Sequence, residues 1–536
     1  MTRRNSILWA AACLAVAGVG WIGVPAAGTA AAATPWTGTW AVAPQSSGTT
    51  FDNQTLRQIV HTSISGSVAR IHLSNAFGNQ AVAIADVHIA QRTSGSAVNP
   101  STDRTVTFGG QTSTTIPAGG SVVSDTIAFA VAAQSDVAIS VFLPSGTGPA
   151  TFHQVGNQTN FSVSGDASGN GTLTGAQTFG SYYFLTNLDV QNTAALGSVV
   201  TLGASITDGI ASRSDVNLRW PNDLASRLIA AGQTVGVLNE GISGNQLLRD
   251  GAGQSALNRF SRDVLSQPNV RWVIFADDPI NDLGSNNPPP SATQLINGIK
   301  QLMSQAHQAG IKFLCSTLTP FEGSGGWSPN NETERGAIDS FIRGAGSGCD
   351  AIVDQDTATH DPANPTRYLP SLDSGDHLHP NEAGLQAIAN AVPVSAFGPP
   401  STGGGTPVIS LRAHANGDIV TADNAGAAPL IANRTAIGTW EQFDELDQGN
   451  GNIALRAHAN GDIVTADNAG ASPLIANRTA IGPWETFQLI HNGDGSVSFR
   501  AMANGDIVTA DNAGASPLIA NRTAIGPWEE FDLIND

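Results

Sequence analysis

The sequence predicts a multidomain protein with three folded parts, and three observations support this. From Trp36 to about Asn192, apolar and polar residues alternate as in half-buried strands. Near Ser198 the pattern changes to short apolar strands that alternate with helical segments, and after Pro407 a sequence repeat begins. We therefore expect an N-terminal β-sandwich-like domain at 34–195, an α/β domain with a parallel sheet at 196–397, and a closed β fold at 408–536.

Composition narrows the classes of function. Charged residues make up only 12% of the 536 residues, and the net charge is −19. An acidic chain repels phosphate backbones, so we expect no nucleic-acid partner.

The N-terminus has the features of an export signal at 1–33. Arg3 and Arg4 are followed by an apolar run at 7–24 and by small residues at 31–33. An uncleaved membrane anchor is the alternative. No later segment is long and apolar enough to span a membrane, so we expect a secreted, extracellular protein whose export route stays open.

The cysteines fit this expectation. Cys13 lies in the export signal, which leaves Cys315 and Cys349 as an even pair. In an exported protein such a pair predicts a disulfide, with two free buried thiols as the alternative.

The N-terminal β domain shows no catalytic constellation. Val137, Ile139 and Val141 illustrate its alternating pattern. Its histidines lack metal-ligand spacing and are expected to be strand or surface residues: His61, His72, His88 and His153.

The next domain alternates strands and helices, which predicts a parallel sheet covered on both faces. After the strand at 199–202, the expected strands are 235–238, 272–275, 313–318 and 351–353. The expected helices are 222–231, 294–308, 332–342 and 381–391.

A Gly- and Pro-rich linker at 398–407 precedes three copies of one unit. Arg412, Arg456 and Arg500 mark equivalent positions, and each copy closes on Trp-Glu-x-Phe, at Trp440, Trp484 and Trp528. Asn416-Gly417 and its counterparts predict hairpin turns. We expect the repeated Trp and Phe side chains in the core.

This repeat resembles the fascin-like β-trefoil modules that are appended to secreted bacterial hydrolases. The resemblance implies a binding role toward carbohydrate, with a polysaccharide as the expected partner. The repeat differs from those modules in having Asp418-Ile419, and its counterparts, where a basic and an aromatic residue are usual. A stabilising module without a ligand is the alternative.

The chemistry centres on Ser205, which follows an apolar strand and Gly203. Residues at the carboxyl ends of strands line the ligand crevice of open α/β sheets, and a serine there is a nucleophile when a base lies within reach. A buried strand followed by a polar turn is the alternative.

A base and its orienting carboxylate stand late in the same domain. Asp376 and His379 are three residues apart, just before a predicted helix. This spacing lets the carboxylate reach Nδ1 and leaves Nε2 for the serine. We expect His377 to face elsewhere.

Ester hydrolysis also needs donors for the developing oxyanion. We expect these to be the backbone N–H groups of Ser205 and Gly244 and the side-chain amide of Asn281, each following a different strand.

These four blocks together resemble the SGNH (GDSL-type) hydrolase family over 198–397. The phrases Leu318-Thr-Pro-Phe321 and Asp373-Ser-Gly-Asp376, with the preceding β domain, are similar to the secreted branch related to arylesterases and acetylxylan esterases. The resemblance implies a three-layer α/β/α fold and ester hydrolysis through an acyl-enzyme, with no metal or cofactor.

Two positions differ from the family pattern. Ala204 stands where Gly-Asp-Ser has its carboxylate, and Pro279 stands where Gly-x-Asn-Asp has glycine. Either change is expected to loosen the oxyanion hole. The expected outcome is a folded hydrolase that is competent or weakened, with inactivity as the alternative. As auxiliary residues, Asp277 or Asp278 is expected to replace the missing carboxylate in part.

The sequence therefore predicts a secreted serine esterase that acts on acylated carbohydrate or small acyl esters. One alternative is a non-catalytic carbohydrate-binding protein. The other is a glycoside hydrolase on the same fold with Asp277, Asp278 or Asp282 as acids, which requires two facing carboxylates roughly 5–10 Å apart.

Overall fold

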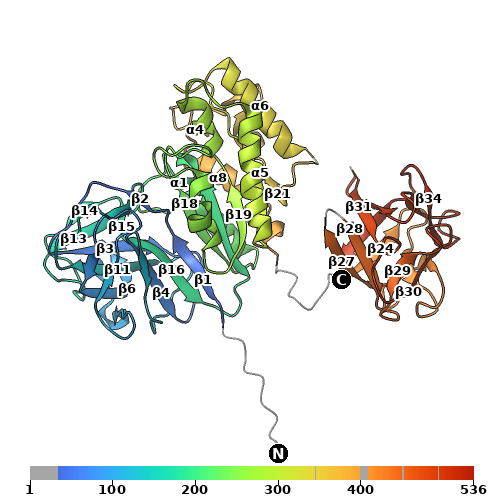
Figure 1. Ribbon diagram of the computed structural model, residues 1–536, viewed down its shortest axis with the longest axis horizontal. Coiled ribbons are helices and arrows are strands. Elements are labelled where there is room, and N and C mark those ends of the chain that lie inside the picture. The colour runs from blue at the N-terminus through green and yellow to red at the C-terminus, as the bar shows by residue number, and fades with distance from the viewer. Residues whose placement is uncertain (1–33, 345, 399–407, 450–451, 493, 536) are drawn as a thin grey trace, which may run out of the picture. The chain divides into compact units, whose positions relative to one another are not determined.

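The computed structural model describes residues 34–344, 346–398, 408–449, 452–492 and 494–535 (Figure 1). The chain divides into two compact units, with the division between Val394 and Ser395. The first unit contains an all-β part and an α/β part, and the expected boundary at 195–196 falls inside it. The expected export signal lies outside the described residues, as does the expected linker except for Gly398, so both stay predictions.

The all-β part consists of antiparallel sheets, as expected. One sheet has the order β1-β16-β4-β10, and a larger one has the order β14-β13-β3-β11-β6-β7 with β8 beside β6. Side chains from both sheets, such as Ile71 of β4 and Ile139 of β11, share one core. The strands are β1 (Trp36–Ala41), β2 (Gln45–Ser46), β3 (Gln54–His61), β4 (Ala69–Ser74), β5 (Val82–Ile84), β6 (Asp86–Ser94), β7 (Ala97–Val98), β8 (Arg104–Thr105), β9 (Thr114–Ile116), β10 (Ser121–Val123), β11 (Asp136–Leu143), β12 (Thr151–His153), β13 (Asn160–Ser164), β14 (Gln177–Phe179), β15 (Tyr182–Tyr183) and β16 (Leu185–Gln191).

The α/β part is built on a parallel sheet with the order β18-β17-β19-β20-β21, which confirms the expected class. Helix α2 packs beside α8, and α5 packs beside α6. Figure 1 shows α5 and α6 among the helices around the sheet. The strands are β17 (Gly197–Gly203), β18 (Val235–Gly241), β19 (Val270–Phe275), β20 (Lys312–Ser316) and β21 (Ala351–Val353), with a small hairpin of β22 (His360–Asp361) and β23 (Asn364–Tyr368). The α-helices are α1 (Ser205–Asp208), α2 (Trp220–Ala230), α3 (Ala256–Phe260), α4 (Asp278–Ser285), α5 (Ala292–Gln308), α6 (Pro329–Arg343), α7 (Gln355–Thr359) and α8 (Glu382–Ala391).

The order of the strands positions the candidate site. The nucleophile strand β17 lies between β18 and β19 and pairs with both in parallel. The carboxyl ends of these three neighbours therefore meet at one edge of the sheet, where ligands of open α/β sheets bind.

The second unit is a closed β structure of three similar repeats, as the sequence predicts. Its first strand β24 pairs with its last strand β35, which closes the barrel. Gly417 has φ +80°, and a left-handed turn there links β24 and β25. The strands are β24 (Val408–Ala413), β25 (Ile419–Ala422), β26 (Leu430–Arg434), β27 (Phe443–Gly449), β28 (Asn452–Ala457), β29 (Ile463–Ala466), β30 (Leu474–Arg478), β31 (Phe487–His491), β32 (Val497–Ala501), β33 (Ile507–Ala510), β34 (Leu518–Arg522) and β35 (Phe531–Asn535).

The repeated aromatic residues of this unit do not all lie in its core. Phe443 and its counterparts Phe487 and Phe531 are buried, as expected. The expectation for the tryptophans was wrong, because Trp440, Trp484 and Trp528 are each 38–39% exposed. Phe443 begins strand β27 and packs inward, whereas Trp440 lies three residues earlier in the preceding turn.

Among the described residues, no helix combines the length and the apolar character that crossing a membrane requires.

Candidate active site

Strand β17 places Ser205 at the first position of the short helix α1. Gly203 has to be glycine here, because an added Cβ would lie 2.4 Å from Oδ1 of Asp277 and 2.2 Å from Oγ1 of Thr207. Ser205 is only 9% exposed, and its Oγ lies 2.8 Å from Nε2 of His379. The structure thus brings together the serine and the histidine that the sequence singles out.

His379 is held in turn by Asp376. Its Nδ1 lies 2.6 Å from Oδ2 of the carboxylate. The other oxygen accepts hydrogen bonds from the backbone N–H groups of Leu378 and His379. Partial burial acts to raise the pKa of Asp376, but the hydrogen bonds from His379 and Leu378 outweigh it and hold the pKa far below its ordinary value. A carboxylate that stays ionised keeps the Nδ1 proton in place and leaves Nε2 to accept a proton from the serine.

A second acid–histidine pair occurs in the same loop. Nδ1 of His377 lies 2.5 Å from Oδ2 of Asp373. This pair contacts neither Ser205 nor His379 through any hydrogen bond of the described residues, as expected for His377. It provides a matched control for the pair formed by Asp376 and His379.

The expected oxyanion donors follow the two strands beside β17. Gly244 lies in the loop after β18 with φ +81°, a conformation that suits glycine. Asn281 lies in α4, after β19, and its Nδ2 donates to the carbonyl of Asn245 at 2.9 Å. This bond joins the two donor segments and leaves one amide hydrogen of Asn281 free of it. No described residue accepts a hydrogen bond from the backbone N–H of Ser205 or Gly244.

Pro279 does not disturb this arrangement in the way its sequence position suggests. It lies in the first turn of α4, where a backbone N–H has no helical partner and the φ of proline suits the helix. The helix that begins at Asp278 is not among the helices expected from the sequence, because a proline there is typical of a break.

The carboxylate of Asp277 lies against the turn that carries the nucleophile. Oδ2 accepts the N–H of Ile206 at 2.9 Å, and Oδ1 accepts the hydroxyl of Thr207 at 2.5 Å. Of the two candidates to replace the carboxylate absent at Ala204, it is Asp277 that reaches this turn.

Asp278 and Asp282 have other surroundings. Both oxygens of Asp278 are buried without a hydrogen-bond partner, and the nearest cation, Arg259, is 3.9 Å away. Burial raises the pKa of Asp278 to about 7, against the opposing effect of Arg259. Asp282 accepts the backbone N–H groups of Leu247 and Leu248, and burial raises its pKa to about 6. Because all three aspartates are buried, the geometry gives no support to their service as acids in glycoside hydrolysis.

Arg259 is a central residue that the sequence analysis did not identify. It is fully buried and donates to the carbonyl of Gly203, the last residue of β17, and to that of Glu240, the second-last residue of β18. Its Nε also donates to Oδ1 of Asn245, beside Gly244. The guanidinium therefore ties the nucleophile strand to the loop that holds an oxyanion donor. No local sequence signal marks these contacts, since Gly203, Glu240 and Asn245 lie 56, 19 and 14 residues away in the chain.

A hollow of about 120 Å³ lies beside the oxyanion donor Asn281. Asn281 and Leu378, the neighbour of His379, lie on its wall. The rest of the lining is mainly apolar or small, and comprises Ile280, Gly284, Ser285, Phe321, Ser324 and Gly326.

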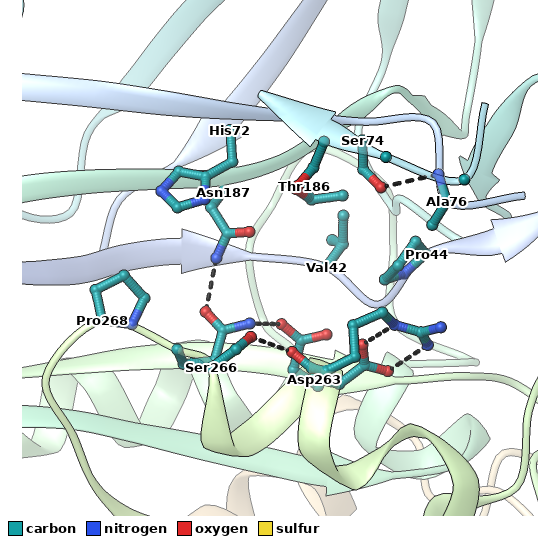
Figure 2. A pocket seen from close by; sticks show the side chains of 16 residues that line it. Val42, Pro44, His72, Ser74, Ala76, Thr186, Asn187, Asp263, Ser266 and Pro268 are labelled. Atoms are coloured by element: carbon teal, nitrogen blue, oxygen red, sulfur yellow. Dashed lines mark hydrogen bonds and ion pairs between the residues drawn. The ribbon is translucent and has the colours of Figure 1, made fainter. Parts of the chain in front are cut away.

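A second hollow, of about 260 Å³, lies between the all-β and α/β parts of the first unit. Figure 2 shows His72, Thr186 and Asn187 on one side of it and Asp263 and Ser266 on the other. Its lining includes neither Ser205 nor His379, so we do not assign the chemistry to it.

The expected disulfide is present, with a bond between Cys315 and Cys349. Within the described part of the chain, the side chains close enough to share a metal ion are His414, Asp494 and Glu530. They lie in the second unit, and Nε2 of His414 is already 2.8 Å from Oδ1 of Asp532.

Part of the chain matches a known protein family. Residues 201–387 match the model of the GDSL-like lipase/acylhydrolase family, and this range contains all five expected site residues. No curated protein matches the chain.

Similar solved structures include a putative lipolytic protein of the G-D-S-L family from Desulfitobacterium hafniense DCB-2, at 20% identity and TM-score 0.29, over 36% of this chain and 96% of that one. A GDSL-like lipase from Bacteroides thetaiotaomicron VPI-5482 has 17% identity and TM-score 0.28, over 37% and 87%. The designed 3-fold symmetric protein ThreeFoil has 23% identity and TM-score 0.23, over 24% and 99%.

Proposed function

Because residues 201–387 form a GDSL-like lipase/acylhydrolase domain, we propose that the protein is a serine esterase that cleaves short acyl esters through an acyl-enzyme. The observation that carries the proposal is the chain of contacts from Ser205 Oγ to His379 Nε2 at 2.8 Å and from His379 Nδ1 to Asp376 at 2.6 Å. This is the relationship that a serine nucleophile, its base and an orienting carboxylate require.

In the proposed reaction, Ser205 Oγ attacks the ester carbonyl carbon while His379 Nε2 takes the hydroxyl proton. The N–H groups of Ser205 and Gly244 and the amide of Asn281 stabilise the negative charge on the carbonyl oxygen. As the tetrahedral intermediate collapses, His379 gives the proton to the leaving alcohol. Water then attacks the acyl-enzyme, with His379 as base, and the acid and free Ser205 are formed.

The hollow beside Asn281 supports a short acyl group. Gly284 and Gly326 belong to its lining and lie close together, since an added Cβ on Gly326 would lie 2.9 Å from Cα of Gly284. Ile280 and Phe321 give it apolar walls that suit a hydrocarbon chain. Its volume of about 120 Å³ is below the roughly 300 Å³ at which pockets for drug-sized ligands begin, so it suits a short acyl chain.

The test uses p-nitrophenyl acetate and a fluorophosphonate label on the full chain. We expect wild type to hydrolyse the ester and to carry the label on Ser205, and Ser205→Ala to do neither. Equal hydrolysis by wild type and Ser205→Ala would end the esterase proposal.

For the second unit we propose binding of a polysaccharide, so that acylated carbohydrate becomes the natural substrate class. The observation that favours this is the exposure of Trp440, Trp484 and Trp528 at equivalent positions of the three repeats. An exposed indole offers a flat apolar face against which a sugar ring can stack, with a polar edge that remains hydrated. If the second unit does not bind a polysaccharide, the esterase proposal is unaffected.

We also propose that the protein acts outside the cell. The disulfide between Cys315 and Cys349 supports this, because structural disulfides persist in oxidising compartments.

A further inference from the structure

His153 lies in the all-β part, at the end of β12, and is only 2% exposed. Its Nδ1 is 3.0 Å from the carbonyl oxygen of Ala43. Its Nε2 is 3.1 Å from the carbonyl oxygen of Val155 and 3.1 Å from Oδ1 of Asp208. A carbonyl oxygen only accepts hydrogen bonds, so both ring nitrogens need an N–H. The contacts therefore require the doubly protonated, positively charged imidazolium.

The partner of this cation belongs to the catalytic segment. Asp208 is the last residue of α1, three positions after Ser205, and is 1% exposed. While Oδ1 faces His153, Oδ2 accepts both the backbone N–H of Ser243 at 2.9 Å and its hydroxyl at 2.7 Å. Ser243 directly precedes Gly244. The buried ion pair thus leads from the all-β part to the oxyanion loop.

The residues after His153 hold the same segment at further points. Asn157 donates to the carbonyl of Gly209 at 2.7 Å and to Ser212 at 3.0 Å. Asp215 accepts hydrogen bonds from Gln158 and Thr159. The all-β part therefore contacts Asp208 and the residues that follow it, and among these contacts it is His153 that reaches the catalytic helix.

We propose that His153 is a positioning residue for the reaction, and that the all-β part in this way completes the active site. His153 holds Asp208 through Nε2, and Asp208 fixes the loop of Ser243 and Gly244 at the oxyanion. Removal of His153 would leave Oδ1 of Asp208 buried without this partner, so Asp208 would reorient and release Ser243. This inference rests on the proposed esterase function.

The test compares His153→Gln with His88→Gln. His88 lies in β6 of the same all-β part, also between acceptors, with Asp103 at 2.7 Å and Asp86 at 3.2 Å. Both of these partners belong to the all-β part. We expect His153→Gln to lower kcat on p-nitrophenyl acetate by about tenfold or more with little change in KM, since direct loss of an oxyanion donor costs ~10²–10³ in kcat. His88→Gln should leave both parameters unchanged.

The split between kcat and KM separates a positioning role from a merely structural one. A structural loss lowers Tm and the amount of folded enzyme, whereas a misplaced oxyanion donor lowers the kcat of the folded enzyme and leaves KM nearly unchanged.

Two further measurements keep the outcome decisive. Ser243→Ala removes one donor to Asp208 from a part-exposed residue, so it should lower kcat several-fold even if His153→Gln does not fold. Nitrogen NMR of the histidine rings should show both His153 nitrogens protonated near neutral pH. This readout needs no activity and therefore separates failure of the inference from failure of the esterase proposal. A neutral His153 ring, or wild-type kcat in both variants with only a lower Tm, overturns the inference.

Discussion

Oδ1 of Asp277 accepts a hydrogen bond from the hydroxyl of Thr207 at 2.5 Å, and Oδ2 accepts one from the backbone N–H of Ile206. A carboxylate that follows β19 therefore holds the turn that carries Ser205. In a Gly-Asp-Ser block the carboxylate stands beside the nucleophile in sequence. Here that position is Ala204, which is fully buried, and a carboxylate reaches the turn from a neighbouring strand instead.

Asp277→Asn should lower kcat on p-nitrophenyl acetate by about tenfold or more. The NH₂ group of asparagine would face either the N–H of Ile206 or the hydroxyl of Thr207, which both donate to Asp277 in wild type. A donor left buried without an acceptor costs roughly 1–3 kcal/mol. Ala204→Asp should bring no gain in kcat and should lower Tm, because it buries a carboxyl without room or partner. A large gain in kcat from Ala204→Asp alone would contradict the role given to Asp277.

Asp376→Asn should lower kcat by on the order of 10⁴, as expected when the catalytic histidine is left in the wrong tautomer. The matched control is Asp373→Asn, which breaks the neighbouring pair with His377 and should keep kcat within a few-fold of wild type. Comparable losses in both variants would argue against the specific assignment of Asp376. Steady-state kinetics with melting curves for both proteins provide the measurement.

Asp278→Asn should stabilise the protein above about pH 7. Burial raises the folded-state pKa of Asp278 to about 7, far above that of an unfolded aspartate. Between about pH 4 and pH 7 the unfolded chain loses this proton while the folded protein keeps it, so wild-type stability falls as pH rises through that window. The variant lacks this slope. A rise of the pKa from 3.8 to about 7, at about 1.36 kcal/mol per pKa unit, makes its advantage at pH 8 at most on the order of 4 kcal/mol. Denaturant unfolding of both proteins at pH 4 and pH 8 checks the difference, and an equal gap at both values would refute it.

Gly284→Ala should narrow the choice of acyl chain. A Cβ at this position would lie 3.4 Å from Cα of Gly326, which is ordinary contact, and alanine suits helix α4. We expect hydrolysis of p-nitrophenyl acetate to persist while the butyrate and hexanoate esters lose several-fold in kcat/KM. Gly336→Ala in α6 is the matched control, because its Cβ meets nothing within 4 Å. An unchanged ratio among the three esters would show that the acyl chain lies elsewhere.

Replacement of Trp440, Trp484 and Trp528 by alanine should abolish retention on an insoluble polysaccharide and leave esterase activity on the soluble ester unchanged. The indoles are partly exposed, so the second unit should keep its fold, which circular dichroism can verify. A panel of cellulose, xylan and chitin pull-downs reports retention. Equal retention of the triple variant and wild type would remove the tryptophans from binding, and absence of wild-type retention on the whole panel would count against the proposal.

The sequence was informative wherever chemistry depends on local spacing. The strand before Ser205, the spacing of Asp376 and His379 and the repeat after Pro407 all carry short-range patterns, and the structure places them as these patterns predict. Arg259 and His153 were missed because their partners are buried backbone atoms and carboxylates that only the tertiary fold brings near. Asp277 was named from the sequence together with Asp278, and only its contact with Thr207 in the fold distinguishes the two.

The closure of the second unit by pairing of β24 with β35 has a consequence for its synthesis and engineering. Ile409 pairs with Asn535, so the barrel cannot close until its last strand has left the ribosome, and this long-range contact carries a loop-closure cost in folding. Since its first and last strands are neighbours, the unit should also tolerate a circular permutation that joins them and opens the chain at a turn between repeats.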